Sequence, residues 1–354
     1  MQELPEVDLF LGTGEFQHID RQLKKLAAGR QKKKIFTDHA TYLLNPATPR
    51  ILATPRYCAY VKIAEGCSHR CTYCTIPKIR GPYKSRPPLS IAAEVRDLTA
   101  AGVREVNLIA QDTTQYGLNS SFRGGLSGLL KKFAAVPDLR WIRLLYCHPL
   151  NITPELISLI AAQKNICRYL DLPLQHISDQ MLKRMGRRIT RARTEALLHA
   201  LREKVPDIAI RTTFMVGFPG ETEKDFSAQL KFVDDFKFDH LGVFRYRDEE
   251  GTAASRLPHK VPEKIKDERY HAVMGLQAKI SRSKNRRRIG EELQVLVEGP
   301  AQKKGYGLQG RAEFQAPEVD GVVYIKQGTA AAGTFVNVKI TGALTYDLTA
   351  EALP

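Results

Sequence analysis

Three of the chain's six cysteines lie within eight positions, in the stretch "EGCSHRCTYCTIPKIRG" at residues 65–81. Cys67, Cys71 and Cys74 are separated by three residues and then by two. A structural zinc ion usually takes four protein ligands, often as two separated pairs. His69 lies between the cysteines, where one ion could hardly bind all four side chains. A cluster of iron and sulfur, which cysteine thiolates normally hold, is the better explanation.

With only three thiolates, one iron of a 4Fe–4S cluster keeps an open position for a substrate or a cofactor. The other cysteines, Cys58, Cys147 and Cys167, each stand alone in strand-like segments, and we interpret them as small buried core residues. Six cysteines in 354 residues are too few for a disulfide scaffold. This sparse use of cysteine favours a reducing, cytoplasmic location.

The segments that position the cysteines alternate between strand-like and helix-like patterns, which is typical of parallel βαβ units. Six runs rich in Val, Ile, Tyr and Phe occupy residues 57–66, 104–110, 140–146, 167–175, 208–218 and 240–247. Because eight such units would close a full barrel, six predict an α/β fold with an open, partial barrel. The cysteines follow the first run directly. They therefore lie at the carboxyl end of the strands, where such folds gather their active sites.

The end of the chain follows a different pattern. After a long helical stretch, 262–289, five short β-like runs are separated by Gly or Pro turns. Five strands in a segment of about 65 residues predict a small antiparallel barrel of the oligonucleotide-binding type. We therefore place the partial barrel and its last helix at 51–289 and the small barrel at 290–354.

The net charge of +16 is unevenly distributed. Residues 291–354 carry five Lys and Arg against eight Asp and Glu, a net charge of −3, which leaves +19 for residues 1–290. A basic body indicates contact with nucleic acid or a ribonucleoprotein, and a solvated basic surface is the alternative. The runs "KKK" at 32–34 and "RRR" at 286–288 are candidates for RNA contact on the same terms. No stretch is long and apolar enough to span a membrane.

The cysteine spacing, with Tyr73 just before the last cysteine, resembles the radical S-adenosylmethionine enzymes. This resemblance implies that the open iron binds S-adenosylmethionine and that an electron from the cluster cleaves it to a 5′-deoxyadenosyl radical. The longer stretch "EGCSHRCTYCTIPKIRGPYKSRP" and "RTTFMVGFPGET" resemble the methylthiotransferases of that superfamily, and the final barrel looks like their TRAM domain. Those enzymes insert a sulfur and a methyl group at a C–H bond.

Four segments are similar to the branch that modifies an aspartate of small-subunit ribosomal protein twelve: "LIAQDTTQYG", "YLDLPLQHISD", "DEEGTAASRLP" and "GRAEFQAPEVDG". "YCHP" at 146–149 is nearer the tRNA-modifying branch. The resemblance implies a protein methylthiotransferase whose partners are this ribosomal protein, or the small subunit, and an electron donor. A tRNA methylthiotransferase is the alternative, and a non-catalytic zinc-bearing binding module is a second. The acidic terminal barrel favours a basic ribosomal protein, since a tRNA-binding barrel should itself be basic.

The resemblance also suggests contacts to the cofactor, and it names no catalytic side chain. Gly102 and Glu105 partly match a Gly-Gly-Glu segment that holds the amino group of the cofactor, although a glycine that ends a helix needs no functional reason. An inward-facing Arg211 requires an anionic partner, either the cofactor carboxylate or a nearby Asp or Glu. Polar residues after the second and fourth strands could reach cofactor or substrate. The predicted cofactor contacts are Tyr73, Gly102, Glu105, Gln175 and Arg211.

Methylthiotransferases carry a second cluster, which three further cysteines hold in an N-terminal domain and which takes part in sulfur delivery. Residues 1–50 contain no cysteine, and "PEVDLFLGTGEF" resembles the end of that domain. We therefore expect 1–50 to be a remnant of the domain with a linker. One cluster and S-adenosylmethionine are expected here, and a second 4Fe–4S cluster only in full-length members. This chain alone is then expected not to complete sulfur insertion.

Overall fold

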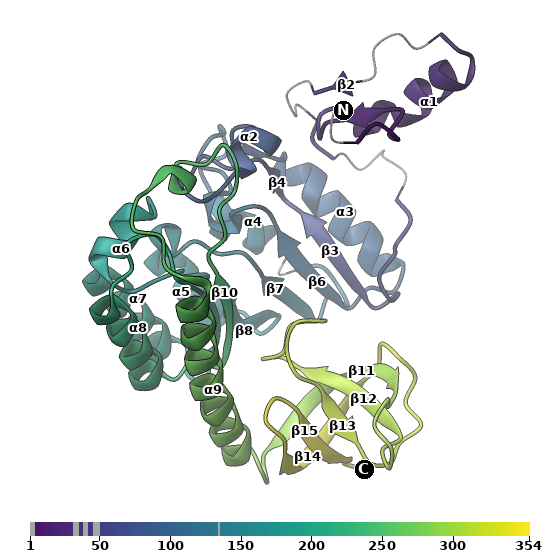
Figure 1. The fold of residues 1–354 in the computed structure, drawn as a ribbon. Helices are drawn as coiled ribbons and strands as arrows, with labels where there is room; N and C mark the ends of the chain where they lie inside the picture. Colours follow the sequence, from purple (N-terminus) through teal and green to yellow (C-terminus); the bar gives the residue numbers. More distant parts are fainter. Residues whose placement is uncertain (1–3, 31–34, 38–41, 45–49, 134) are drawn as a thin grey trace.

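The computed structural model describes residues 4–30, 35–37, 42–44, 50–133 and 135–354. The basic run at 32–34 lies outside these residues. An open sheet with its helices and a small closed barrel are the two main bodies, and the long helix α9 (Glu263–Arg287) leads from one to the other (Figure 1). None of the described helices is both long and apolar enough to cross a membrane.

A small N-terminal part lies to one side of these bodies (Figure 1). It contains the parallel strand pair β1 (Phe10–Leu11) and β2 (Ile35–Phe36) and the helix α1 (Ile19–Ala27).

The open sheet has six strands in the order β10-β9-β8-β7-β6-β3, and every neighbouring pair is parallel. The predicted six-stranded, partial α/β barrel is therefore confirmed. The strands are β3 (Cys58–Lys62), β6 (Glu105–Ile109), β7 (Trp141–Leu144), β8 (Ile166–Asp171), β9 (Ala209–Val216) and β10 (His240–Arg245).

The two faces of the sheet differ because successive residues of a strand point to opposite sides. In β6, Val106 and Leu108 belong to the main hydrophobic core. Glu105 and Asn107 alternate with them and are also fully buried. One face therefore packs into the hydrophobic core, and the other face carries polar side chains into the interior of the partial barrel.

The helices between the strands are α3 (Pro88–Ala100), α4 (Gly125–Phe133), α5 (Pro154–Ala162), α6 (Asp179–Arg184), α7 (Arg191–Lys204) and α8 (Glu223–Phe236).

The C-terminal domain is a closed five-stranded barrel in the order β11-β12-β13-β15-β14. Closure leaves no open sheet edge. The predicted small barrel is confirmed, but the expectation of wholly antiparallel strands is wrong, because β13 and β15 pair in parallel. The strands are β11 (Glu292–Pro300), β12 (Leu308–Ala312), β13 (Val323–Ile325), β14 (Phe335–Ala343) and β15 (Leu348–Ala352).

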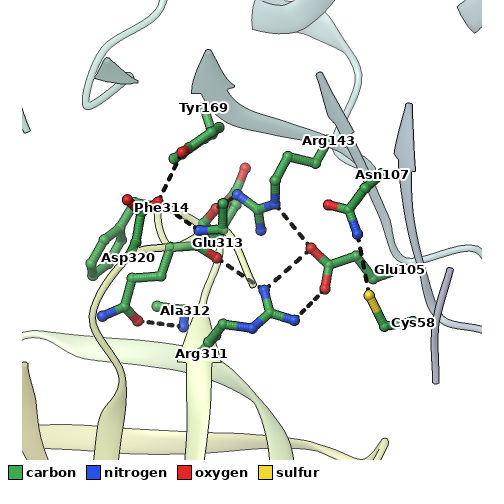
Figure 2. A network of polar contacts seen from close by, with 12 residues as sticks. Cys58, Glu105, Asn107, Arg143, Tyr169, Arg311, Ala312, Glu313, Phe314 and Asp320 are labelled. Atoms are coloured by element: carbon green, nitrogen blue, oxygen red, sulfur yellow. Dashed lines mark hydrogen bonds and ion pairs between the residues drawn. The ribbon is translucent and has the colours of Figure 1, made fainter. Parts of the chain in front are cut away.

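A network of buried charges joins this barrel to the amino-terminal end of the sheet (Figure 2). The carboxylate of Glu105 accepts hydrogen bonds from Arg143 Nε at 2.9 Å and from Arg311 Nη2 of β12 at 2.5 Å. The Tyr169 hydroxyl donates to Asp320 Oδ2 at 2.8 Å. These side chains are largely hidden from solvent, so the small barrel is docked through specific polar contacts.

Candidate active site

The cysteine loop lies at the carboxyl end of β3, between the short strand β4 (Ala64–Glu65) and the helix α2 (Ile76–Arg80); the strand β5 (Lys84–Ser85) pairs with β4. All three thiols are free, with Cys67 buried and Cys71 and Cys74 half-buried. Burial, and then the charges of Asp112, Cys71 and Cys74, raise the pKa of Cys67 to about 11. The three thiols therefore lie close enough to influence one another.

The chemistry of this donor set fits a cluster, since one loop at the carboxyl end of the sheet carries three thiols. As the side chains stand, no group of three or more His, Cys, Asp or Glu among the described residues could hold a metal ion. Ligation of a cluster by Cys67, Cys71 and Cys74 therefore stays a prediction.

Backbone contacts hold the cysteine loop from two sides. Thr72 N–H donates to the carbonyl of Met185 at 3.0 Å, and the Thr72 carbonyl accepts from Ala254 N–H at 2.8 Å. Gly186 has a φ of 73°, and a Cβ there would lie 2.6 Å from the carbonyl oxygen of Arg70. Only glycine lets the chain after α6 approach the loop so closely. These backbone contacts therefore hold the cysteine loop in one conformation.

Asp112, three residues after the end of β6, holds the same loop through hydrogen bonds of its side chain. Its buried carboxylate accepts from His69 Nε2 at 2.6 Å, Thr114 Oγ1 at 2.5 Å and Gln115 Nε2 at 3.0 Å. Burial alone would raise the pKa of Asp112, but the hydrogen bonds from His69 and Thr114 outweigh it and lower the pKa. An ionised Asp112 therefore fixes His69, which stands between two of the cysteines.

His148, after β7, stacks on His69 with ring centroids 4.0 Å apart and planes at 20°. Its Nδ1 accepts a hydrogen bond from Leu150 N–H at 3.2 Å, so the neutral ring carries its proton on Nε2. Burial, helped by the charges of Arg187 and His69, lowers the pKa of His148 to about 2. The Nε2 atom is buried and has no partner within the described part of the chain. A buried N–H without an acceptor requires an explanation.

Arg187, in the turn after α6, places a positive charge next to Cys71. Its Nη1 lies 3.9 Å from Cys71 Sγ, and its Nη2 donates to the Pro173 carbonyl at 2.6 Å. Its buried Nε finds no acceptor among the residues that the structure describes. No sequence pattern distinguishes Arg187 from its neighbour Arg188, because only the tertiary fold brings Arg187 to the cysteines.

Two of the predicted cofactor contacts lie at this end of the sheet. Tyr73 packs edge-on against Phe218, with ring centroids 6.4 Å apart, and its hydroxyl interacts with Cys71. Gln175 has a left-handed φ of 72°, and both its backbone N–H and its carbonyl form hydrogen bonds with the backbone of β9. Residues other than glycine rarely adopt this conformation, and where they do it often marks a functional constraint.

Gly102 and Glu105 are not brought to the cysteines. Glu105 begins β6 and pairs in register with Cys58, the first residue of β3, so it lies at the opposite end of the sheet. Its carboxylate is already occupied by Arg143 and Arg311. Gly102, with a φ of 105°, follows the end of α3 and supplies the conformation that ends a helix. This geometry removes both residues from the candidate site.

Arg211 meets protein carboxylates, the second of the two predicted alternatives. Its Nη1 donates to Asp171 at 3.0 Å, and its Nε lies 3.5 Å from Asp320 of the small barrel. Arg211 therefore belongs to the contact between the two domains, and it needs no cofactor carboxylate to balance its charge.

Comparison with known proteins agrees with this arrangement. A radical SAM superfamily model matches residues 61–233, and a TRAM domain model matches residues 289–353. The ribosomal protein uS12 methylthiotransferase RimO of Geobacter sulfurreducens is 47% identical over 352 residues, which cover 99% of this chain and 78% of that protein. The chain belongs to the RimO family. RimO of Desulforamulus reducens is 46% identical over 352 residues, covering 99% of this chain and 79% of the relative.

Membership confirms the predicted enzyme class, a radical SAM methylthiotransferase, and the superfamily implies a 4Fe–4S cluster and S-adenosylmethionine. Two solved structures share the fold at low identity. The radical S-adenosylmethionine methyltransferase TsrM from Kitasatospora setae aligns with a TM-score of 0.55 at 20% identity, over 70% of this chain and 54% of that one. The cobalamin-dependent radical enzyme OxsB aligns at 0.51 and 13% identity, over 79% of this chain and 41% of that one.

Proposed function

We propose that this chain adds a methylthio group to the β-carbon of an aspartate in ribosomal protein uS12. The observation that carries the proposal is the 47% identity to a RimO protein across 99% of the chain, in a fold that presents three cysteines on one loop at the carboxyl end of the sheet. Both relatives described above are named for uS12, which favours the protein substrate over the tRNA alternative.

In this proposal Cys67, Cys71 and Cys74 hold a 4Fe–4S cluster and leave one iron open for S-adenosylmethionine. When bound there, a reduced cluster would supply the electron for cleavage of S-adenosylmethionine, the chemistry by which the family removes a hydrogen from a carbon. The protein's part is to fix the cysteine loop, to exclude water and to orient the reactants. Asp112, through His69, and the backbone of Thr72 fix the loop.

Two buried donors without a partner support a carboxylate site beside the cysteine loop. His148 Nε2 and Arg187 Nε are buried beside the cysteine loop, and neither has an acceptor in the described residues. A carboxylate accepts charge-assisted hydrogen bonds well, and both S-adenosylmethionine and the target aspartate carry one. Tyr73 and Gln175 complete this end of the proposed site, Tyr73 by packing beside Cys71.

We propose the small barrel as the contact for uS12, although fewer of its acidic side chains are free than its sequence suggests. Glu298 binds Arg311 within the small barrel, while Glu313 and Asp320 bind residues of the sheet. Glu292 and Glu318 stay exposed. Much of the acidity of the small barrel therefore stabilises its own structure and its docking, and the remaining exposed carboxylates are the ones available to a basic partner.

The test is anaerobic reconstitution with iron and sulfide, followed by S-adenosylmethionine, a reductant and purified uS12. We expect about four irons per chain, as a single 4Fe–4S cluster requires. Iron binding and 5′-deoxyadenosine formation should be lost in Cys71→Ala. Cys167→Ala is the matched control, because Cys167 is equally a free thiol but is buried in β8. Its iron content should match the unmodified chain.

Product analysis separates the substrate classes. Mass spectrometry of uS12 locates any methylthio group on an aspartate when the sulfur source is present, and formation of that product by this chain alone would overturn the expectation that the chain cannot complete sulfur insertion. Zinc as the only bound metal, without cleavage of S-adenosylmethionine, would contradict the proposal. Modification of tRNA adenosine in place of uS12 would support the tRNA alternative. Whether this chain completes sulfur insertion alone is read from the same product.

A further inference from the structure

A basic groove of about 1000 Å³ lies at the amino-terminal end of the sheet, where the sheet, the last turn of α9 and the small barrel meet. Seven Lys and Arg side chains line it, against four Asp and Glu. It lies at the opposite end of the strands from the cysteine loop. The groove is therefore separate from the candidate active site.

The acidic residues of the groove form ion pairs with two of its seven cations. Asp239 binds Lys284 and the backbone N–H of Ile210, and Glu291 binds Arg288 at 3.0 Å. Three further cations are left: Lys164, Arg168 and Arg287 are exposed, and the described residues offer no partner to their side chains. These three cations are available to an anion from outside.

The basic surface continues along α9. Arg287 lines both the groove and a second hollow of about 420 Å³, which is also lined by Lys279, Arg282 and Arg286. From Lys279 to Arg287 the helix rises by about 12 Å at 1.5 Å per residue. The cations therefore form a track and not a closed pocket, which suits a polymer better than a small metabolite.

The arginines of the groove are partly fixed in place. The guanidinium of Arg288 lies 3.9 Å from the centroid of the Phe314 ring, and that of Arg140 lies 4.8 Å from the Phe335 ring. Stacked guanidinium groups keep their N–H forks in one orientation and bind phosphate oxygens in pairs. Phosphate contacts of this kind dominate the affinity of proteins for nucleic acids.

We propose that this groove and the adjoining face of α9 bind the phosphate backbone of structured RNA. The identity of that RNA rests on the proposed function, because a ribosomal protein is bound to ribosomal RNA. With RNA held at the amino-terminal end of the sheet, the cysteine end stays open for the target aspartate. The contact therefore positions the enzyme on its substrate and takes no part in cofactor cleavage.

The test compares two triple variants of equal charge change, with purified small-subunit ribosomal RNA as the probe. The groove variant is Lys164→Gln, Arg168→Gln and Arg287→Gln; the control is Arg96→Gln, Lys132→Gln and Lys224→Gln, on the outer helices α3, α4 and α8. Each lost phosphate contact lowers the slope of log K against log salt by about 0.7–0.9. We expect the slope to fall by about two to three in the groove variant and to stay unchanged in the control.

A slope that is unchanged in the groove variant, or that falls equally in both variants, would overturn the proposal. Arg287→Gln alone should lower the slope by about one, and it guards against misfolding of the triple variant. S-adenosylmethionine cleavage should be equal in all variants. Intact RNA binding without cleavage of S-adenosylmethionine by the reconstituted protein would count against the proposed function and leave this inference standing.

Discussion

The buried polar groups at the two ends of the six-stranded sheet differ in how their charges are paired. At the amino-terminal end, Glu105, Arg143 and Arg311 are buried and joined by hydrogen bonds of 2.5–3.3 Å, although Arg143 Nη2 has no partner among the described residues (Figure 2). At the carboxyl end, His148 Nε2 and Arg187 Nε are buried without a partner in the described residues, and no carboxylate pairs with Arg187 there. A network of paired charges stabilises and specifies a fold, whereas unsatisfied groups are costly unless a ligand completes them. The first end is therefore built to hold a domain, and the second to receive a ligand.

The largest expected effect follows from removing the central charge of the buried network. Glu105→Gln leaves Arg143 without its carboxylate partner in a site closed to solvent and leaves Arg311 with Glu298 alone. Removing one partner of a buried ion pair costs about 3–5 kcal/mol. We expect the free energy of unfolding in urea to fall by this amount.

The matched control for this change is an exposed ion pair. Glu155→Gln breaks the pair with Lys131, in which both side chains are more than half exposed, and should cost about 1 kcal/mol or less. Equal losses in the two variants would mean that the buried network contributes no more to docking than a surface contact.

The stability contributed by the two ends of the sheet should depend on pH over different ranges. Burial acts to raise the pKa of Glu105, but Arg311 and Arg143 outweigh it and lower the pKa below its ordinary value. A carboxyl group with a lowered folded pKa stabilises the protein above its unfolded pKa of about 4.3. This contribution is lost only as the pH falls below that value, so the amino-terminal end should be insensitive to pH between 5 and 7.

His148 predicts the opposite behaviour at the carboxyl end. Its pKa is lowered to about 2, chiefly by burial, so the folded state keeps it neutral while the unfolded state binds a proton below about pH 6.5. The folded protein should therefore lose about 1.4 kcal/mol of stability per pH unit below 6.5, relative to His148→Gln. Parallel stability curves for the two proteins from pH 7 to 5 would contradict this assignment.

The sequence predicted the fold class and the position of the cysteines because both depend on local patterns. The alternation of β and α segments and the C-x₃-C-x₂-C spacing can be read directly. It did not predict which polar residues meet. Glu105 was assigned to the cofactor, yet its partner Arg311 lies 206 residues away along the chain. Arg187 likewise reaches Cys71 over 116 residues. Such contacts depend on tertiary packing, which no local pattern encodes.

The smallest expected effect concerns Arg187, whose charge lies next to the cysteines. Burial raises the pKa of Cys74, and the positive charge of Arg187 acts against this rise. Arg187→Gln should therefore slow the alkylation of Cys74 in the cluster-free protein at pH 8, because a smaller fraction of the thiol is ionised. Mass spectrometry of timed iodoacetamide reactions measures that rate.

Arg188→Gln is the control for the same experiment, because Arg188 is exposed and is the next residue along the chain. It removes an equal charge without removing the guanidinium that lies 3.9 Å from Cys71 Sγ. If both variants slow alkylation equally, the effect comes from the overall charge of the protein, and Arg187 has no specific influence on the thiols. If only Arg187→Gln slows it, the Arg187 guanidinium acts on the thiols directly, whereas Arg143 and Arg311 at the other end are paired with the carboxylate of Glu105.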